Sequence, residues 1–303
     1  MTQLLPTDLS SIIVTGGAGF IGSHLVDRLV LAGRKVFVID DLSTGLASNV
    51  NGKAFVKYKP IQHIQFMGQP YLDQLGRVEV IFHLAADARI QPSFQHPAHT
   101  YDVNSSGTIQ VLEFARKLGA KVVYAGSSSV YHDTFASPYA YSKHLGETHC
   151  TLYHRLFGVE CAIARFFNVY GPRQLTAGNY ATVLGIFERQ WKAGEPLTVV
   201  GDGSQRRDMT HVEDVVDGLM AILNKNIWDA SVFNFGSGRN YSIIEVAQMF
   251  KSPAVTFLPE RRGEYPSTLA DISMSQVRLG WQPKHNLEDY VKSVVDQHQA
   301  KPI

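Results

Sequence analysis

The sequence predicts an α/β fold in which a doubly wound parallel sheet is followed by a smaller, discontinuous second part. Short apolar runs alternate with helix-like segments through the first half, several runs are continuously apolar, and the alternation stops after residue 171. Continuously apolar strands are typical of a sheet buried on both faces, and strand–helix repetition is typical of parallel sheets. The 303 residues leave room for two domains of roughly 150 residues each.

The element order follows from these patterns. Apolar runs predict strands at 11–16, 35–40, 54–58, 78–86, 121–128 and 160–169, with a later strand at 231–238. Helical periodicity predicts helices at 20–32, 101–118, 139–157 and 180–193, and an amphipathic helix at 287–298. We assign 1–171 and about 208–236 to the sheet domain, and about 172–207 and 237–303 to a C-terminal substrate-binding domain.

Charge and cysteine content exclude several classes of protein. Basic residues number 28 and acidic residues 27, and the sequence has no long run of residues of one charge sign. Binding to nucleic acid or to an anionic membrane surface is therefore not expected. Cys150 and Cys161 are expected as packing residues in a reducing compartment. No segment approaches about 20 apolar residues, and the N-terminus lacks the pattern of a signal peptide. We therefore expect a soluble, cytoplasmic protein.

Three glycines, Gly16, Gly19 and Gly22, lie between the first strand and the first helix, within VTGGAGFIGSHL. Their spacing allows a tight turn, close approach of backbone to a pyrophosphate, and binding of that anion at the helix N-terminus. Asp40 and Asp41 end the second strand, where a carboxylate accepts hydrogen bonds from adenosine ribose hydroxyls and repels a 2′-phosphate. This pattern predicts a Rossmann-type domain that binds NAD in preference to NADP. In the alternative interpretation the two aspartates only cap a turn.

A serine cluster ends the strand at 121–128, and Tyr139 and Lys143 lie four residues apart on the next predicted helix. Ligands of open parallel sheets bind at the carboxyl ends of strands, so Ser127, Tyr139 and Lys143 are candidate catalytic residues. A nearby ammonium and the positive nicotinamide ring favour a phenolate, which lets Tyr139 act as a general base while Ser127 orients the substrate hydroxyl. Alternatively, Tyr139 and Lys143 are an ordinary surface pair.

Taken together, these motifs resemble the extended short-chain dehydrogenase/reductase family, in its nucleotide-sugar epimerase and dehydratase branch. The matching segments are TGGAGFIGSHL, HLAA, SSSVY, PYAYSK, ARFFNVYGPRQ, GDGSQRRDMTHVEDVVDG and FNFGSGRNYSI. The resemblance implies catalytic roles for Ser127, Lys143 and Tyr139, which unlike Tyr141 has a lysine four residues on. It also implies that NAD is contacted by Gly16, Gly19, Phe20, Ile21, Gly22, Asp40, Asp41, Leu84, Ala85, Ala86, Asn104, Tyr139 and Lys143.

The same resemblance implies a nucleotide-diphosphate sugar as substrate, with a UDP-sugar expected. Ser128 and Ser129 are expected to contact the sugar, and Asn168, Arg207 and Arg261 resemble residues that hold the diphosphate. Either arginine is alternatively a solvated surface residue. Because members often dimerise through two helices, the helices at 101–118 and 139–157 are expected to form a homodimer.

The reaction expected from the resemblance begins with oxidation of the sugar at C4. Dehydratases of the family have a pair of acidic residues directly after the residue with the catalytic hydroxyl, and decarboxylases tend to have a glutamate near this point. This chain has Ser128 and Ser129 at these positions. We expect an NAD-dependent 4-epimerase that inverts C4 of a UDP-hexose through a transient 4-keto sugar. A 4,6-dehydratase, an NAD(P)H-dependent 4-keto-sugar reductase and a non-catalytic dinucleotide-sensing protein are the alternatives.

The chain departs from the family at two places. The loop between Ser127 and Tyr139 is shorter than usual, which leaves the sugar undetermined, and VKYKPIQHIQF lacks the aspartate usual near the adenine. No metal site is expected, because successive histidines in KHLGETHCTLYH are five residues apart and only Cys150 and His154 could share a helix face.

Overall fold

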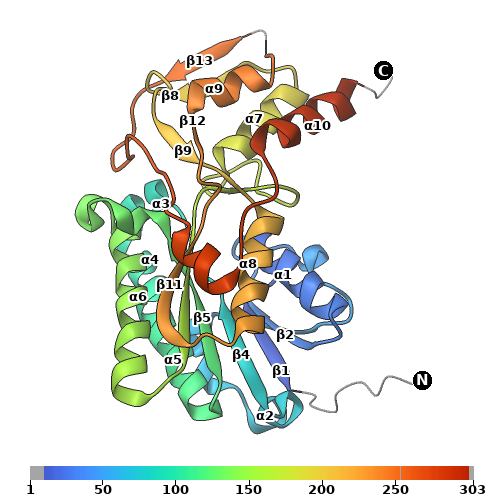
Figure 1. Ribbon diagram of the computed structural model, residues 1–303, viewed down its shortest axis with the longest axis vertical. Helices are drawn as coiled ribbons and strands as arrows, with labels where there is room; N and C mark the ends of the chain where they lie inside the picture. Colours follow the sequence, from blue (N-terminus) through green and yellow to red (C-terminus); the bar gives the residue numbers. More distant parts are fainter. Residues whose placement is uncertain (1–9, 253, 300–303) are drawn as a thin grey trace.

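Seven parallel strands form the central sheet of the computed structural model, which describes residues 10–252 and 254–299 (Figure 1). The strand order is β11-β6-β5-β4-β1-β2-β3, which confirms the predicted doubly wound α/β fold. The strands are β1 (Ser11–Thr15), β2 (Lys35–Asp40), β3 (Phe55–Tyr58), β4 (Val78–His83), β5 (Lys121–Ser127), β6 (Cys161–Phe166) and β11 (Asp229–Phe235).

Helices cover both faces of this sheet (Figure 1). On one face, α1 (Phe20–Leu31) and α8 (Val212–Lys225) bury Leu25 and Leu219 in one apolar core. On the other face, α5 (Gly107–Leu118) and α6 (Pro138–Phe157) bury Val111 and Cys150 in a second core, which also contains Cys161 and part of α2 (Gln69–Leu75). Both cysteines are free and buried, as expected of packing residues.

Some helix boundaries differ from the predicted ones for local reasons. The segment expected as one helix at 101–118 is α4 (Pro97–Tyr101), a π-helical turn (Asp102–Ser106) and α5, preceded by α3 (Ile90–Gln95). The helix expected at 180–193 is α7 (Val183–Lys192), because the Thr182 side chain accepts a hydrogen bond from the Gly185 N–H and caps the helix there. The sequence analysis did not single out α8, although Glu213 and Asp214 in its first turn favour a helix start.

The smaller part of the chain lies beyond the carboxyl edge of the sheet (Figure 1). It contains β8 (Leu197–Val200) paired with β13 (Val255–Leu258), and β9 (Arg206–Asp208) paired with β12 (Asn240–Ser242). A third apolar core gathers side chains of α7, α9 (Ile243–Met249) and α10 (Leu287–Gln299). The short strands β7 (Val169–Tyr170) and β10 (Thr210–His211) pair beside it. The domain boundaries at about 171, 208 and 236 remain a prediction.

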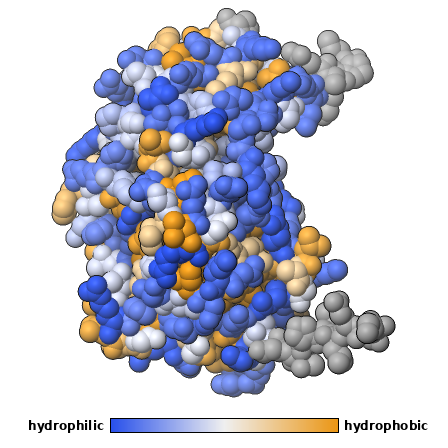
Figure 2. Space-filling model, viewed as in Figure 1, coloured by the Kyte–Doolittle hydropathy of each residue, from blue (hydrophilic) through white to orange (hydrophobic). Residues whose placement is uncertain are grey.

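The face of the molecule in Figure 2 is mainly hydrophilic, with small groups of apolar side chains between polar ones. Within residues 10–252 and 254–299, no helix combines the length and the apolar character needed to cross a membrane. The N-terminal segment 1–9, which entered the expectation about a signal peptide, lies outside the described residues.

Candidate active site

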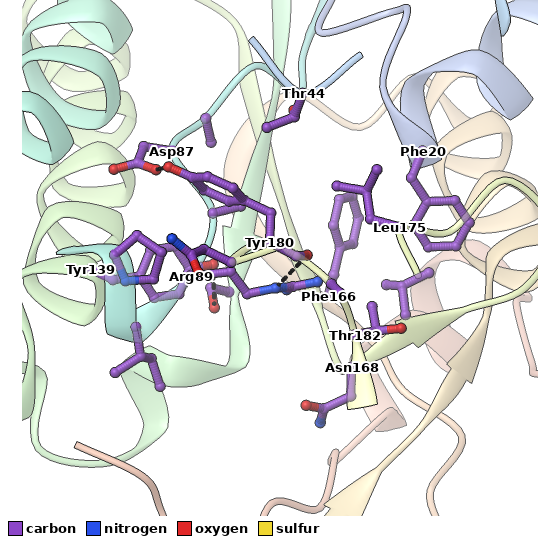
Figure 3. A pocket seen from close by; sticks show the side chains of 18 of the residues that line it. Phe20, Thr44, Asp87, Arg89, Tyr139, Phe166, Asn168, Leu175, Tyr180 and Thr182 are labelled. Atoms are coloured by element: carbon purple, nitrogen blue, oxygen red, sulfur yellow. Dashed lines mark hydrogen bonds between the residues drawn. The ribbon is translucent and has the colours of Figure 1, made fainter. Parts of the chain in front are cut away.

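A cavity of about 800 Å³ lies at the carboxyl ends of β1, β2, β4, β5 and β6, between the sheet and the smaller part of the chain. Figure 3 shows Asp87, Arg89 and Tyr139 on one side of this cavity, with Phe20 and Leu175 across from them. Ligands of open parallel sheets bind at this edge. Every predicted site residue except Asn104 lines this cavity.

The glycine-rich turn after β1 forms one end of the cavity. Gly16 has a φ of 71°, and a Cβ on it would lie 2.7 Å from the backbone nitrogen of Ala85. A Cβ on Gly22 would lie 2.1 Å from the carbonyl oxygen of Gly16, so the first turn of α1 packs directly on the preceding turn. No side chain caps α1 at Gly19, and its first turn has no acidic residue. The helix N-terminus can therefore hold a pyrophosphate group.

Asp40 lies beside this turn and is 6% exposed. Its two carboxylate oxygens accept hydrogen bonds from the N–H groups of Ala18 (2.9 Å) and Leu42 (2.8 Å), and burial raises the pKa of the carboxyl group. Each oxygen can accept a further bond, so Asp40 both holds the turn and faces the expected ribose. Asp41 is exposed, and its carboxylate caps the turn at Ser43 (2.9 Å to the N–H). The turn-capping interpretation therefore describes Asp41 better than Asp40.

Leu84, Ala85 and Ala86 line the cavity, whereas Asn104 does not, so the cofactor contact expected of Asn104 stays a prediction. Asn104 is 1% exposed and lies in the π-helical turn behind the cavity wall. Its side chain accepts a hydrogen bond from the N–H of Asp87 (2.8 Å) and donates to the carbonyl oxygen of Asp87 (2.9 Å) and to Ser142 (3.0 Å). It therefore positions the segment after β4 from behind.

Ser127 and Tyr139 meet in the cavity. The Tyr139 hydroxyl lies 3.3 Å from the Ser127 hydroxyl, which in turn accepts hydrogen bonds from the N–H (3.2 Å) and hydroxyl (2.9 Å) of Ser129. Ser137 caps α6 by accepting a hydrogen bond from the Ala140 N–H, and so fixes the helix that presents Tyr139. Tyr141 does not line the cavity; its ring stacks on Phe135 at 5.1 Å.

The electrostatics of Tyr139 differ from the expectation that Lys143 acidifies it. Burial raises the pKa of Tyr139, while the hydrogen bond with Ser127 and the charge of Arg89 lower it. Lys143 is 4% exposed, its ammonium lies 4.5 Å from the ring centroid of Tyr124, and burial lowers its pKa to about 8 against the opposing charge of Glu147. The charge of Arg89 therefore favours the phenolate form of Tyr139.

The residues expected to bind substrate all line the cavity, but Ser129, Asn168 and Arg207 already have protein partners. Arg207 is 8% exposed, forms an ion pair with Glu264 (2.9 Å) and donates to the carbonyl oxygen of Tyr265 (2.7 Å). Asn168 donates from its amide to the carbonyl oxygen of Asp208 (2.8 Å), which leaves its own carbonyl oxygen as an acceptor. Arg261 is exposed at the rim.

The shortened loop after Ser127 is completed by a distant part of the chain. The hydroxyl of Tyr265 donates a hydrogen bond to the carbonyl oxygen of Ser129 (3.2 Å), and the His132 ring stacks on the Tyr265 ring at 4.4 Å. Ser128 and Ser129 therefore form part of the wall on which Tyr265 packs.

Among the cavity residues that the sequence analysis missed are Asp87, Arg89 and Tyr180. Asp87 is 6% exposed and accepts hydrogen bonds from the hydroxyls of Tyr180 (2.7 Å) and Thr100. Arg89 donates from Nε to the carbonyl oxygen of Tyr180 (2.9 Å). The signal available in the sequence was an acidic and a basic residue, Asp87 and Arg89, just after HLAA at the carboxyl end of a predicted strand.

The metal interpretation has no structural support. Within the described ranges, no three His, Cys, Asp or Glu side chains are arranged to hold a metal ion. His149 shares a hydrogen bond with Ser105 (3.0 Å), and Cys150 is buried in the core.

A dinucleotide groove that ends at a Ser–Tyr–Lys set defines the chain as a member of the short-chain dehydrogenase/reductase class. The sequence pattern of the NAD dependent epimerase/dehydratase family matches residues 12–236, and the chain belongs to that family. It is an enzyme of the nucleotide-sugar epimerase/dehydratase type, and its cofactor is NAD.

Individual relatives differ in their named reactions. The chain is 35% identical to a putative UDP-glucose 4-epimerase of Methanocaldococcus jannaschii, over 94% of this chain and 97% of that protein. It is 33% identical to UDP-glucuronic acid decarboxylase 1 of Danio rerio, over 97% of this chain and 75% of that protein. The crystal structure of UDP-glucose 4-epimerase from Thermotoga maritima with UDP-glucose superposes with a TM-score of 0.87 at 32% identity, over 95% of this chain and 98% of that one.

We predict that Asp40→Asn weakens the discrimination between NAD and NADP. The substitution removes the negative charge that repels a 2′-phosphate, an interaction of about 1–4 kcal/mol, so the ratio of the two dissociation constants should fall about tenfold or more. Titration calorimetry with both cofactors measures this ratio. Asp41→Asn is the matched control and should change the ratio little; equal effects of the two substitutions would contradict the assignment.

Proposed function

We propose that this chain is an NAD-dependent nucleotide-diphosphate-sugar 4-epimerase that inverts C4 of a UDP-hexose through a transient 4-keto sugar. The observation that carries this proposal is the pair of hydroxyls of Ser127 and Tyr139, 3.3 Å apart, with the hydroxyl of Ser129 2.9 Å from that of Ser127. Such a site can remove and return a proton at one sugar hydroxyl. The family and the named relatives support a nucleotide-sugar substrate.

The proposed roles follow from the positions of the side chains. Tyr139 takes the proton of the C4 hydroxyl, and Ser127 hydrogen-bonds that hydroxyl and orients it. NAD held in this groove would supply the acceptor for the C4 hydride. Lys143 binds the nicotinamide ribose from the helix turn after Tyr139. The turn at Gly16 and Gly22 binds the pyrophosphate of the cofactor.

Inversion at C4 requires that the 4-keto sugar presents its other face before the hydride returns. Asn168, Arg207 and Arg261 hold the diphosphate in this proposal, so the nucleotide stays in place while the sugar turns within the cavity. Elimination of water would need a further acid and base next to the sugar. Among the described cavity residues, the acids near Tyr139 are engaged, Asp87 by Tyr180 and Glu264 by Arg207. This arrangement favours epimerisation over dehydration.

The experiment that tests the proposal is an incubation of the NAD-loaded enzyme with a panel of UDP- and GDP-sugars, followed by NMR of the products. We expect inversion at C4 without net change in NAD, and Tyr139→Phe should lower turnover by about 10²–10⁴-fold while NAD binding stays nearly unchanged. A 4-keto-6-deoxy product would indicate a dehydratase, and stoichiometric consumption of reduced cofactor a reductase. Absence of turnover with every sugar would favour the dinucleotide-sensing alternative.

The pH dependence of turnover should report on Ser127. Oxidation requires the deprotonated phenol, so kcat/KM rises with pH until the pKa of Tyr139 is passed. The hydrogen bond with Ser127 lowers that pKa, so Ser127→Ala should move the rising limb to higher pH and reduce activity more at neutral than at alkaline pH. Ser128→Ala is the control, because Ser128 has no hydrogen bond to Tyr139 among the described contacts. An unchanged limb in Ser127→Ala would contradict this role.

We also propose a homodimer formed through α5 and α6. The outer face of α6 exposes Leu152 and Leu156, which are 45% and 66% exposed and lie one turn apart. Pairing these helices with a second copy would bury both side chains. Light scattering after gel filtration should give twice the mass of one chain. Leu156→Glu should shift the measured mass towards that of a single chain. A monomeric wild-type protein would refute the proposal.

A cytoplasmic location likewise remains a proposal, supported by the two free buried cysteines.

A further inference from the structure

Among the described residues, Arg89 is a cation in the wall of the cavity that forms no ion pair. It follows β4 and the segment 84–86, and its guanidinium group points into the cavity beside Tyr139 (Figure 3). The hydrogen bond from Nε to the carbonyl oxygen of Tyr180 (2.9 Å) fixes the orientation of the planar group. The two terminal nitrogens remain available as a fork of donors, a geometry that matches a carboxylate.

Other arginines in the interior are balanced by acids. Arg207 pairs with Glu264 at 2.9 Å, and Arg165 pairs with Glu147 at 2.6 Å. Across residues 10–252 and 254–299, Arg89 forms no ion pair, although burial disfavours its charge. The nearest acid along the chain, Asp87, has its two oxygens engaged by Tyr180 and Thr100. Arg89 is half-buried, and a half-buried guanidinium without an ion-pair partner loses hydration that an anionic ligand would partly offset.

The position of Arg89 identifies the part of the ligand that it faces. Figure 3 shows Arg89 on the same side of the cavity as Tyr139, at the proposed reacting end. Glu264, whose charge acts on Arg89, also lines the cavity and pairs with Arg207 at the proposed diphosphate end. A sugar that connects these two ends must pass Arg89. In a hexose, the substituent on C5 is adjacent to C4, so a guanidinium beside the group that takes the C4 proton can reach a carboxylate there.

We propose that Arg89 binds a carboxylate on C5 of the sugar, and that the substrate is a nucleotide-diphosphate hexuronic acid. This inference rests on the proposed function, because it assumes that the sugar reaches Tyr139. In the reaction, the O4 proton passes to Tyr139 and the C4 hydride to NAD; both then return, the hydride to the opposite face. The carboxylate keeps all its bonds, and its charge stays paired with Arg89 throughout.

The test compares the binding of UDP-glucuronic acid and UDP-glucose to the NAD-loaded enzyme by titration calorimetry. The nucleotide is the same in both ligands, so the ratio of affinities isolates the carboxylate. We expect the wild-type enzyme to prefer the acid, and Arg89→Gln to weaken binding of the acid by about 10-fold to 100-fold while changing that of UDP-glucose less than about threefold. Arg89→Lys, which retains the charge but not the fork, should give an intermediate ratio.

Arg261→Gln is the matched control, because a residue that holds the diphosphate should weaken both ligands equally. NAD affinity and the thermal transition of each variant establish that the variant is folded. If Arg89→Gln does not fold, the ratio of the affinities of Arg89→Lys for the two ligands tests the proposal instead. Equal weakening of the two ligands by the Arg89 substitutions, or a wild-type preference for UDP-glucose, would overturn the proposal.

Product analysis separates this inference from the proposed function. UDP-galacturonic acid formed from UDP-glucuronic acid would support both. A UDP-pentose formed with loss of carbon dioxide, together with the expected affinity ratios, would keep the carboxylate at Arg89 but refute the 4-epimerase. C4 inversion of UDP-glucose with no preference for UDP-glucuronic acid would support the 4-epimerase but refute the carboxylate at Arg89.

Discussion

The close contact between two backbone segments at the carboxyl edge of the sheet determines the geometry of the whole site. The turn after β1 lies against the segment after β4, where a side chain on Gly16 would overlap the backbone of Ala85. Only glycine at this left-handed φ allows the contact. Because the contact sets where residues 84–89 lie, it also places Asp87 and Arg89 in the cavity wall.

Tyr180 connects the two sides of that cavity. Its hydroxyl binds Asp87, its carbonyl oxygen accepts from Arg89, and Asn104 holds Asp87 in place from behind. The cofactor side and the segment leading into α7 therefore share one hydrogen-bonded group. Polar groups buried in such a network keep a defined geometry because each has a partner. The network explains how one arginine can be held in the cavity with most of its donors still unused.

The sequence was sufficient for the sheet, for α1 and α6, and for the meeting of Ser127 with Tyr139, because apolar periodicity and turn residues are local signals. It was insufficient for Asn104, which lies in a π-helical turn where the usual helical spacing does not predict the direction of a side chain. Arg89 had no periodic context, and only the packing of the segment after β4 places its charge beside Tyr139. The burial of Lys143 beside Tyr124 likewise could not be inferred from spacing.

The packing of Tyr265 on the short loop has a consequence for exchanging parts between relatives. Tyr265 and Ser129, joined by a hydrogen bond, are 136 residues apart in the chain, and His132 stacks on the same ring. A longer loop transplanted from a relative would have to displace Tyr265 before it could reach the sugar. This wall of the cavity is thus built jointly by two remote segments, and a chimaera that replaces one without the other would lose the packing between them.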